Sequence, residues 1–327
     1  MKYMQIGKSG ISASVVSLGA FGIGGGATWS DTTLDAQGTS RLLDAALECG
    51  VNMIDSAPVY GIGAGEVLLG EALKGKRDKF IFQTKCGLNW RGESEVVEYV
   101  RDGKTVCRDL SAQAIRKDLE DCLRRLQTDY IDIFITHRQS DIVGVEETMG
   151  ELMKMLEEGK IRAIGISNAT PERLRDYSKI GHVALVQEKF SLLSQQNKNE
   201  YIPACEELGV TFQVFSSLEA GSLTGPQVIG KTFPLGDFRG YFKWFTEEMR
   251  PHMEAFYKNL EPLCEKYDCS YSNLVQAWTL QQSPVMNLLT GIRRIESLKD
   301  TIKAVDIALD CADIDKIQAE ADKLLAI

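Results

Sequence analysis

Four ionisable side chains follow short apolar segments that are typical of strands. Asp55, Lys85 and His137 each end such a segment, and Tyr60 follows Asp55 after a turn of small residues and a proline. Parallel strands bring their C-terminal ends to one edge of the sheet, where the following loops build active sites. We therefore expect Asp55, Tyr60, Lys85 and His137 to meet at one site.

The chemistry that such a set can perform is proton donation to a carbonyl. The phenol of Tyr60 has an ordinary pKa of about 10, which is too high for ready donation at pH 7. We expect an ammonium at Lys85 to lower that pKa, and Asp55 to keep Lys85 charged and oriented. A neutral His137 could hydrogen-bond the substrate oxygen or relay the proton.

Each of these residues also has a structural explanation when it is taken alone. Asp55 could cap a helix or a turn, and Tyr60 could be a packed ring with a hydrated hydroxyl. Lys85 could be a solvated charge at a strand end, and His137 a buried histidine with satisfied hydrogen bonds. Chance would rarely place all four at three strand ends, so their joint occurrence favours a catalytic site.

The elements that must position these residues alternate between strand and helix along the chain. We predict strands at 15–18, 51–55, 80–85, 130–137, 161–168, 182–188, 210–216 and 285–290. We predict helices at 34–49, 65–73, 111–126, 146–158, from Thr170-Pro171 onward, and at 251–267, 270–282, 297–309 and 313–325. Eight such units indicate an α/β protein with a (β/α)8 TIM barrel, as one domain over residues 1–327.

Three further segments complete this architecture. Residues 1–14 are expected to form an N-terminal β-hairpin that plugs one end of the barrel. Residues 88–109 are expected to be a polar loop, and residues 219–250 a long loop after strand seven. Ser111 is the expected N-cap of its helix, and Pro171 is placed at the first helical position of another.

In the order and spacing of Asp55, Tyr60, Lys85 and His137, the chain resembles the aldo-keto reductases. The resemblance extends from Ser17-Leu18-Gly19 to Gly291-Ile292-Arg293-Arg294. It is closer to the bacterial branch that is similar to the potassium-channel β-subunits than to the mammalian steroid and aldose reductases. It implies transfer of a hydride between a nicotinamide cofactor and a carbonyl or alcohol. Tyr60 would then be the general acid and base, tuned by Lys85 and Asp55, and His137 would orient the substrate oxygen.

The resemblance also implies a cofactor site built from strand ends. Uncharged donors and acceptors at the ends of strands five and six suit a carboxamide, although strand-end capping would explain them equally well. In the family, matching positions hold the nicotinamide carboxamide, stack on its ring and bind the pyrophosphate. The corresponding residues here are Ser167, Asn168 and Gln187 for the carboxamide, Phe215 for the ring, and Ser216, Leu218 and Gly221 for the pyrophosphate, with Asp55 and Gly22 beside the ring.

A basic pair near the C-terminus indicates where a phosphate could bind. Arg293 and Arg294 precede a predicted helix start at Ser297, and guanidiniums beside a helix N-terminus suit a phosphate monoester. Two solvated arginines in a loop are the alternative. In the family, the segment that holds Gly291, Arg293, Arg294, Ser297 and Thr301 binds the adenosine 2′-phosphate. Ser297 and Thr301 depart from the usual residues there, so NADP(H) is expected and NAD(H) remains an alternative.

The remaining site residues concern the substrate. Trp29 and Trp90 are expected to line its pocket together with Tyr60 and His137. Flat indoles pack on sugar faces, so Trp29, Trp90 and Trp244 would also suit a polyol or sugar dehydrogenase that works in the oxidative direction. A cofactor-binding regulatory subunit with little turnover is the alternative from another class. The expected partner is a small-molecule carbonyl or sugar.

Composition restricts the partners and the compartment. The chain has 327 residues, of which 44% are hydrophobic and 25% charged, and a net charge of −9. This balance disfavours nucleic acid and anionic membrane surfaces as partners. The eight cysteines form no C-x-x-C pair and only three histidines are present, so a zinc site is poorly supported. Free thiols and a polar N-terminus favour a cytoplasmic protein, and a homo-oligomer is left open.

Overall fold

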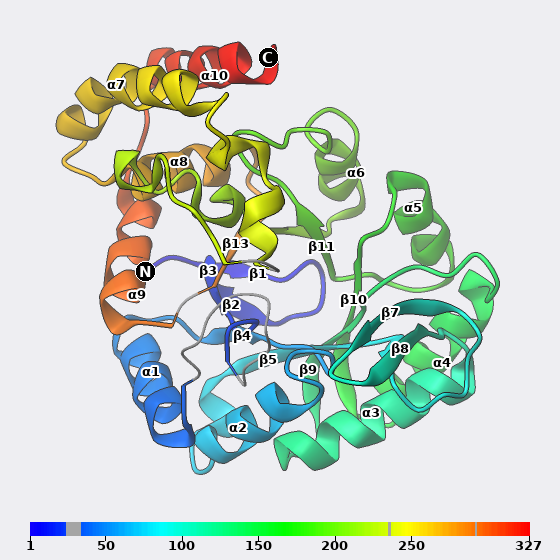
Figure 1. The fold of residues 1–327 in the computed structure, drawn as a ribbon. Helices are drawn as coiled ribbons and strands as arrows, with labels where there is room; N and C mark the ends of the chain where they lie inside the picture. The colour runs from blue at the N-terminus through cyan, green and yellow to red at the C-terminus, as the bar shows by residue number, and fades with distance from the viewer. Residues whose placement is uncertain (24–33, 235–236, 292) are drawn as a thin grey trace.

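Eight parallel strands close into a barrel. The computed structural model describes residues 1–23, 34–234, 237–291 and 293–327, and every structural statement below concerns these ranges (Figure 1). Around the barrel the strands follow chain order. They are β3 (Val16–Gly19), β4 (Met53–Asp55), β5 (Ile81–Cys86), β9 (Ile131–Thr136), β10 (Ile161–Ser167), β11 (Leu185–Lys189), β12 (Thr211–Phe215) and β13 (Met286–Gly291). The predicted TIM barrel is confirmed.

Helices surround the barrel on its outside (Figure 1). They are α1 (Ala36–Glu48), α2 (Ala64–Ala72), α3 (Ala112–Leu126), α4 (Val145–Glu157), α5 (Pro171–Ile180), α6 (Tyr201–Leu208), α7 (Arg250–Lys266), α8 (Tyr271–Leu280), α9 (Ile295–Thr301) and α10 (Cys311–Leu325). Two predicted caps are present, since the Ser111 hydroxyl accepts from the Ala114 N–H and Pro171 occupies the first turn of α5. Helix α6 was not predicted, and the predicted helix 297–309 is wrong in its bounds.

The N-terminal hairpin closes one end of the barrel. It consists of β1 (Tyr3–Gln5) and β2 (Ser12–Ser14), which pair antiparallel. Ile6 and Ala13 pack with Met53, Ile133 and other apolar side chains in a buried cluster. The cluster seals this end against water, so the opposite end of the barrel, where the strands terminate, holds the open face.

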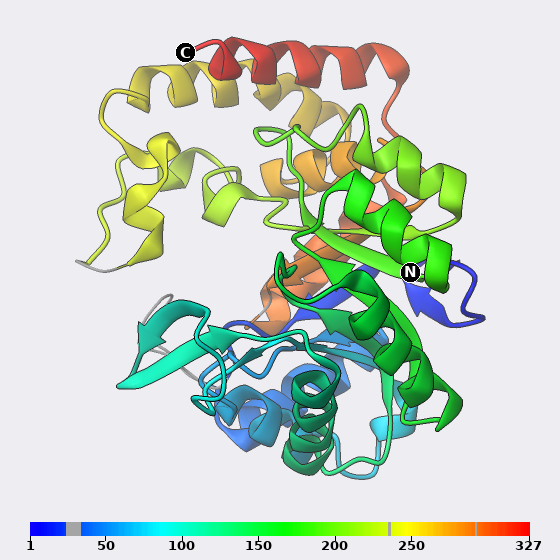
Figure 2. The same ribbon diagram turned by 90° about the vertical axis from the view of Figure 1, so that its right-hand side faces the viewer.

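The predicted polar loop 88–109 is wrong, because it is a small antiparallel sheet in the order β6-β8-β7. The strands are β6 (Leu88–Asn89), β7 (Val97–Arg101) and β8 (Lys104–Arg108). Asp102 and Gly103 join β7 to β8 with φ values of 49° and 71°, the left-handed pair that a two-residue hairpin turn requires. Figure 2 shows this sheet at the end of the barrel away from the hairpin β1–β2.

The long connection after the seventh strand contains short 3-10 helices rather than an unstructured loop. They span Glu219–Gly221, Pro226–Val228, Phe238–Tyr241 and Lys243–Phe245. Trp244 is 8% exposed and packs in the main hydrophobic core. It therefore does not line a sugar pocket, as one alternative from the sequence required.

Candidate active site

The structure brings Asp55, Tyr60 and Lys85 into direct contact at the open end of the barrel. The Lys85 ammonium lies 2.8 Å from Asp55 Oδ1 and 2.9 Å from Oδ2. It donates to the Ser56 carbonyl at 2.8 Å and to the Tyr60 hydroxyl at 3.3 Å. Lys85 is 1% exposed and Asp55 2%. A buried charge of this kind is tolerated only when it is paired and hydrogen-bonded, and Lys85 meets both conditions.

His137 is the fourth member of this group. Its ring centroid lies 6.2 Å from that of Tyr60, with the two rings nearly perpendicular. Its Nδ1 is buried and has no hydrogen-bond partner among the described residues. Burial lowers the pKa of His137 well below its usual value, and the charges of Lys85 and Arg138 lower it further. The imidazole is therefore neutral near pH 7, with a polar atom that can bond an incoming group.

The pKa values show how the phenol and the ammonium are balanced. Burial raises the pKa of Tyr60, the charge of Lys85 lowers it, and that of Asp55 raises it, with a net increase. The expected effect of Lys85 thus has the right sign, but it is smaller than that of burial. Burial also lowers the pKa of Lys85, yet Asp55 and Tyr60 together raise it above its ordinary value. Both groups consequently hold their protons near pH 7.

Two glutamine side chains inside the barrel donate hydrogen bonds to the Asp55 carboxylate. Gln83 Nε2 and Gln187 Nε2 donate to Asp55 Oδ1 at 2.7 and 2.8 Å. The same two nitrogens donate to Gln213 Oε1 at 2.6 and 2.8 Å. Gln187 was expected at the cofactor, and its amide nitrogen is already committed to Asp55 and Gln213. Gln83 and Gln213 were not identified from the sequence, although each is a polar residue within a predicted barrel strand.

Ser167 and Asn168 are hydrogen-bonded to each other and to backbone carbonyls beside His137. The Ser167 hydroxyl donates to the Gln187 carbonyl at 2.7 Å. The Asn168 amide nitrogen donates to the His137 carbonyl at 2.8 Å and to Ser167 Oγ at 3.0 Å. Asn168 has a φ of 51°, a left-handed conformation that asparagine tolerates better than most residues. The two residues thus lie at the strand end where the sequence placed them.

The turn after β12 is strained and firmly anchored. Ser216, Glu219 and Ala220 have φ values of 58°, 44° and 55°, which are costly for residues other than glycine. Glu219 is 1% exposed and accepts from the Ser191 hydroxyl at 2.6 Å. The Gly221 N–H already donates to the Leu218 carbonyl at 2.8 Å. Phe215, the last residue of β12, is partly exposed at the start of this turn.

Three guanidiniums gather near the C-terminal segment. Burial lowers the pKa of Arg293, and the charges of Arg239 and Arg294 lower it further. Arg239 comes from the long connection after β12, and no pattern in the sequence indicated its role. Gly22 lies against this cluster, since a Cβ at Gly22 would be only 2.7 Å from Cδ of Arg293. Asp237 already pairs with Arg239 at 2.6 Å, and the remaining positive charge of the cluster favours a bound anion.

Several residues that were expected to bind the phosphate lie in different positions from those predicted. Helix α9 begins at Ile295 with Arg294 as its N-cap, rather than at Ser297. Ser297 therefore lies in the first turn and is partly exposed, and Gly291 is exposed at the end of β13. Thr301 is 6% exposed at the last position of α9. Its side chain faces the interior, because the helix turns this position towards the core.

The structure describes some, but not all, of the residues that were expected to bind the substrate. Trp29 lies outside the described residues. Trp90 packs with Tyr60 and Ile62 against a small buried cluster at the open end. Phe21, which the sequence analysis did not single out, lies edge-on to Tyr60 with ring centroids 4.9 Å apart and is 37% exposed. Phe21, from the loop after β3, thus contacts the phenol ring directly, and Trp90, just after β6, packs against the same apolar cluster as that ring.

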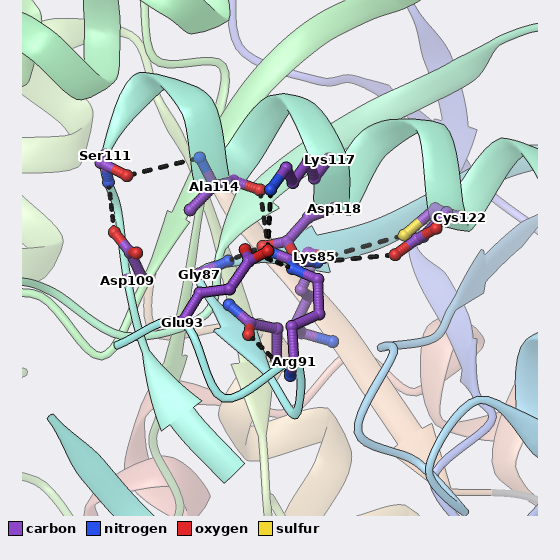
Figure 3. A network of polar contacts seen from close by, with 12 residues as sticks. Lys85, Gly87, Arg91, Glu93, Asp109, Ser111, Ala114, Lys117, Asp118 and Cys122 are labelled. Carbon is purple, nitrogen blue, oxygen red and sulfur yellow. Dashed lines mark hydrogen bonds and ion pairs between the residues drawn. The ribbon is translucent and has the colours of Figure 1, made fainter. Parts of the chain in front are cut away.

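A network of charges fastens the chain just after Lys85 to helix α3 (Figure 3). The Gly87 N–H donates to Asp118 Oδ2 at 2.7 Å, and Arg91 Nη1 donates to Asp118 Oδ1 at 2.7 Å. Arg91 also donates to the Ala114 carbonyl at 3.1 Å. Burial raises the pKa of Asp118 to about 6, although Arg91 opposes that rise. The network fixes the start of the β6-β8-β7 sheet beside the active site.

The described ranges contain neither a candidate metal site nor a candidate membrane-spanning helix. No group of three or more His, Cys, Asp or Glu side chains there is arranged to hold a metal ion. No helix in the same ranges has both the length and the apolar character needed to cross a membrane.

Comparison with known proteins gives a consistent result. A model described as the aldo/keto reductase family matches residues 15–322. The chain is 35% identical to an NADH-specific methylglyoxal reductase from Escherichia coli (strain K12), with 99% of each protein covered. A solved glycerol dehydrogenase from Gluconobacter oxydans superposes with a TM-score of 0.84 at 32% identity, covering 97% of this chain and 92% of that one. An aldo-keto reductase from Bacillus halodurans in its holo form gives a TM-score of 0.76 at 26% identity, covering 98% and 96%.

Proposed function

Because the chain belongs to the aldo/keto reductase family, we propose that it interconverts carbonyl compounds and alcohols with a nicotinamide cofactor. One observation carries the proposal. The Tyr60 hydroxyl lies 3.3 Å from a buried ammonium, Lys85, which Asp55 holds from the other side. A phenol so placed is a proton donor of the kind that carbonyl reduction needs.

Each residue of the group then has a distinct role. Tyr60 donates its proton to the carbonyl oxygen as negative charge develops there. Lys85 stabilises the phenolate that remains, and Asp55 keeps the ammonium aimed at the phenol. Neutral His137 can bond the substrate oxygen and hold the carbonyl in line with the Tyr60 hydroxyl. Asp55 and Lys85 are almost fully buried, and the exclusion of bulk water from their charges strengthens these interactions, while Tyr60 and His137 are partly exposed towards the open face.

The residues around this group fit a nicotinamide. When bound, the cofactor supplies the hydride. His137 Nδ1 has no partner among the described residues, so it is a polar atom with which an incoming group could form a hydrogen bond. Ser167 and Asn168 would hold the carboxamide, and Gln187 would meet it through Oε1, since its nitrogen is used by Asp55 and Gln213. Phe215 would stack on the ring, and the turn Ser216–Gly221 would meet the pyrophosphate.

We further propose that NADP(H) is the preferred form. The supporting observation is the cluster of Arg239, Arg293 and Arg294, in which burial lowers the pKa of Arg293 and repulsion from the other two guanidiniums lowers it further. A 2′-phosphate would relieve that repulsion through charge-assisted hydrogen bonds. NAD(H) is the competing form, because the Escherichia coli relative is described as NADH-specific. The two forms are separated by the binding experiment described in the Discussion.

A small, polar carbonyl compound is the proposed substrate class. The relatives are described as a methylglyoxal reductase and a glycerol dehydrogenase, and both names denote three-carbon compounds. Phe21 packs edge-on against Tyr60 and would form a wall of the pocket, and Trp90, which packs against the same small cluster as Tyr60, is a candidate for a second wall. Oxidation of a polyol is the second candidate, supported by the glycerol dehydrogenase.

The test is a panel of substrates assayed in both directions. Methylglyoxal, glyceraldehyde, simple aldehydes, ketones and aldose sugars would be supplied with NADPH or NADH, and glycerol and sugar alcohols with the oxidised cofactors. Consumption of reduced cofactor that depends on substrate and on Tyr60 supports the proposal. If cofactor binds tightly and no member of the panel turns over, the regulatory alternative replaces it.

A further inference from the structure

A column of amide side chains runs through the interior of the barrel beneath the active site. It starts at Asp55, passes through Gln83 and Gln187 to Gln213, and continues to Asn287. The Asn287 amide nitrogen donates to the Ser14 carbonyl at 2.9 Å, which belongs to the N-terminal hairpin. All four amides are at most 3% exposed. Layers of branched apolar side chains usually fill such an interior, so this arrangement needs an explanation.

The donors and acceptors of these side chains allow only one orientation of each amide in the column. A carboxylate only accepts hydrogen bonds, so Gln83 and Gln187 must point their NH2 groups at Asp55. Their second hydrogens both go to Gln213 Oε1, at 2.6 and 2.8 Å. Gln213 must then send its own NH2 group the other way, to Asn287 Oδ1 at 2.9 Å and Ser17 Oγ at 3.3 Å. Reversing the Gln213 amide would set hydrogens against hydrogens.

Strand register brings the central members side by side. Gln187, Gln213 and Asn287 are direct partners on the adjacent strands β11, β12 and β13. Asp55 and Gln83 are partners on β4 and β5. Gln213 thus joins two groups of strands that are not neighbours in the barrel, and it does so through an atom that accepts from both. Gln83 Oε1 has no partner among the described residues, so the arrangement is retained despite an unsatisfied polar atom.

From this arrangement we propose that Gln213 is a positioning residue for the proposed reaction. Its Oε1 fixes the two amides that fix Asp55, and Asp55 fixes the ammonium that contacts Tyr60. Without that acceptor, Gln83 and Gln187 can rotate about their terminal bonds, and Asp55 loses two directed donors. Lys85 is then held less firmly against the phenol. The Gln213 side chain forms hydrogen bonds with Gln83, Gln187, Asn287 and Ser17, so it acts on Tyr60 and Lys85 only through Asp55. The inference rests on the proposed function.

The main test is Gln213→Met, which keeps the side-chain length and removes the acceptor. Gln276→Met is the matched control, because Gln276 is equally buried but lies in α8 outside the barrel. In single-turnover reduction, we expect Gln213→Met to lower the rate by roughly tenfold to a hundredfold, as small misplacements at a reacting centre do. The KM for the carbonyl should stay nearly constant. The control should be slower by less than about threefold.

A pH profile separates positioning from a loss of stability. Reduction needs a protonated phenol, so its rate falls as pH rises through the pKa of Tyr60. Lys85 lowers that pKa, and a less firmly held Lys85 lowers it less. The falling limb of Gln213→Met should therefore move to higher pH, while that of Gln276→Met should not. Unchanged rate and an unchanged limb in Gln213→Met would overturn the proposal.

Two further measurements keep the test decisive. If Gln213→Met does not fold, Gln213→Leu removes the same acceptor with a smaller apolar side chain. It should shift the falling limb in the same direction, and an unmoved limb in a folded variant counts against positioning. If the wild-type protein reduces nothing, the proposed function has failed independently. Side-chain amide exchange by NMR then decides, because the NH2 groups of Gln83 and Gln187 should exchange slowly in wild type and faster in Gln213→Met.

Discussion

Tyr60 is the residue on which the proposed chemistry depends most directly. It lies between an aromatic edge, Phe21, and an ammonium, Lys85, and burial keeps its proton in place near pH 7. This is the state required of an acid in the reductive direction. The opposite direction needs the phenolate, which forms only at higher pH because the pKa is raised. Reduction should therefore be favoured at neutral pH and oxidation at alkaline pH.

Replacing Tyr60 by phenylalanine should remove the acid and leave the ring. General acid catalysis contributes 10² to 10⁴-fold, so we expect single-turnover reduction to slow by about that factor. Affinity for the reduced cofactor, measured by fluorescence titration, should barely change. A near-normal rate in Tyr60→Phe would identify His137 or a water molecule as the donor instead.

Lys85→Met should damage the same step by another route. It removes the ammonium that lowers the pKa of Tyr60, so the phenol becomes a weaker acid. It also leaves Asp55 buried without its cation, so some loss of stability accompanies the change. Turnover should fall about as far as in Tyr60→Phe. In the double variant the two losses should not add, since both act on one proton. Additive losses would show that Lys85 acts elsewhere.

The arginine cluster makes a prediction about the cofactor. NADPH should bind more tightly than NADH, and Arg293→Ala combined with Arg294→Ala should narrow the difference. A charge-assisted contact is worth roughly 1.5–3 kcal/mol, which corresponds to about tenfold or more in Kd. Arg124→Ala is a suitable control, because Arg124 is exposed and pairs with Asp121 in α3. Equal Kd values for the two cofactors in the wild-type protein would refute the preference.

At the scale of elements, the β6-β8-β7 sheet depends on the network at Asp118. Its carboxylate receives the Gly87 N–H and Arg91, so it ties the end of β5 and the start of the sheet to α3 (Figure 3). Burial raises the pKa of Asp118 to about 6. The folded state therefore binds a proton more tightly than the unfolded chain does.

This linkage gives a pH-dependent prediction. The stabilisation from protonated Asp118 is fully present below the unfolded pKa of about 4 and is lost as pH rises through about 6. Asp118→Asn stays neutral and lacks this dependence. The free energy of unfolding of wild type relative to Asp118→Asn should thus fall by up to about 3 kcal/mol between pH 4 and pH 7. Urea titrations at both values would measure it, and a constant difference would contradict the burial effect.

At the scale of the whole molecule, the N-terminal hairpin closes the end of the barrel opposite the active site. Gly7 has a φ of 52°, and a Cβ there would lie 2.5 Å from the Ala184 carbonyl oxygen. Gly10 has a φ of 77° and open space around it. Gly7→Ala should cost about 3 kcal/mol, from backbone strain and overpacking together. Gly10→Ala should cost about 1 kcal/mol from strain alone. Thermal unfolding followed by circular dichroism would compare them, and equal losses would mean that the plug is not tightly packed.

The sequence by itself determined the barrel and the order of its catalytic residues. Local information was sufficient because apolar segments of strand length alternate with amphipathic helices, and each helix or strand follows from nearby residues. The carboxyl ends of parallel strands must meet, so Asp55, Lys85 and His137 could be placed together without coordinates. The Asp102-Gly103 pair is a recognisable turn signal in the sequence. The strands around it were not predicted, because polar and apolar residues alternate only weakly in β7.

Only the tertiary structure decided what surrounds those residues. Gln83 and Gln213 are 130 positions apart in the chain, and whether their amides meet depends on the register and closure of the barrel. Arg239 lies in the long connection after β12, and only the folded chain brings its charge close enough to act on Arg293. The pKa of Tyr60 likewise depends on burial, which no local pattern specifies. Contacts between residues distant in the chain are set by packing of the whole molecule, and that is why they became visible only in three dimensions.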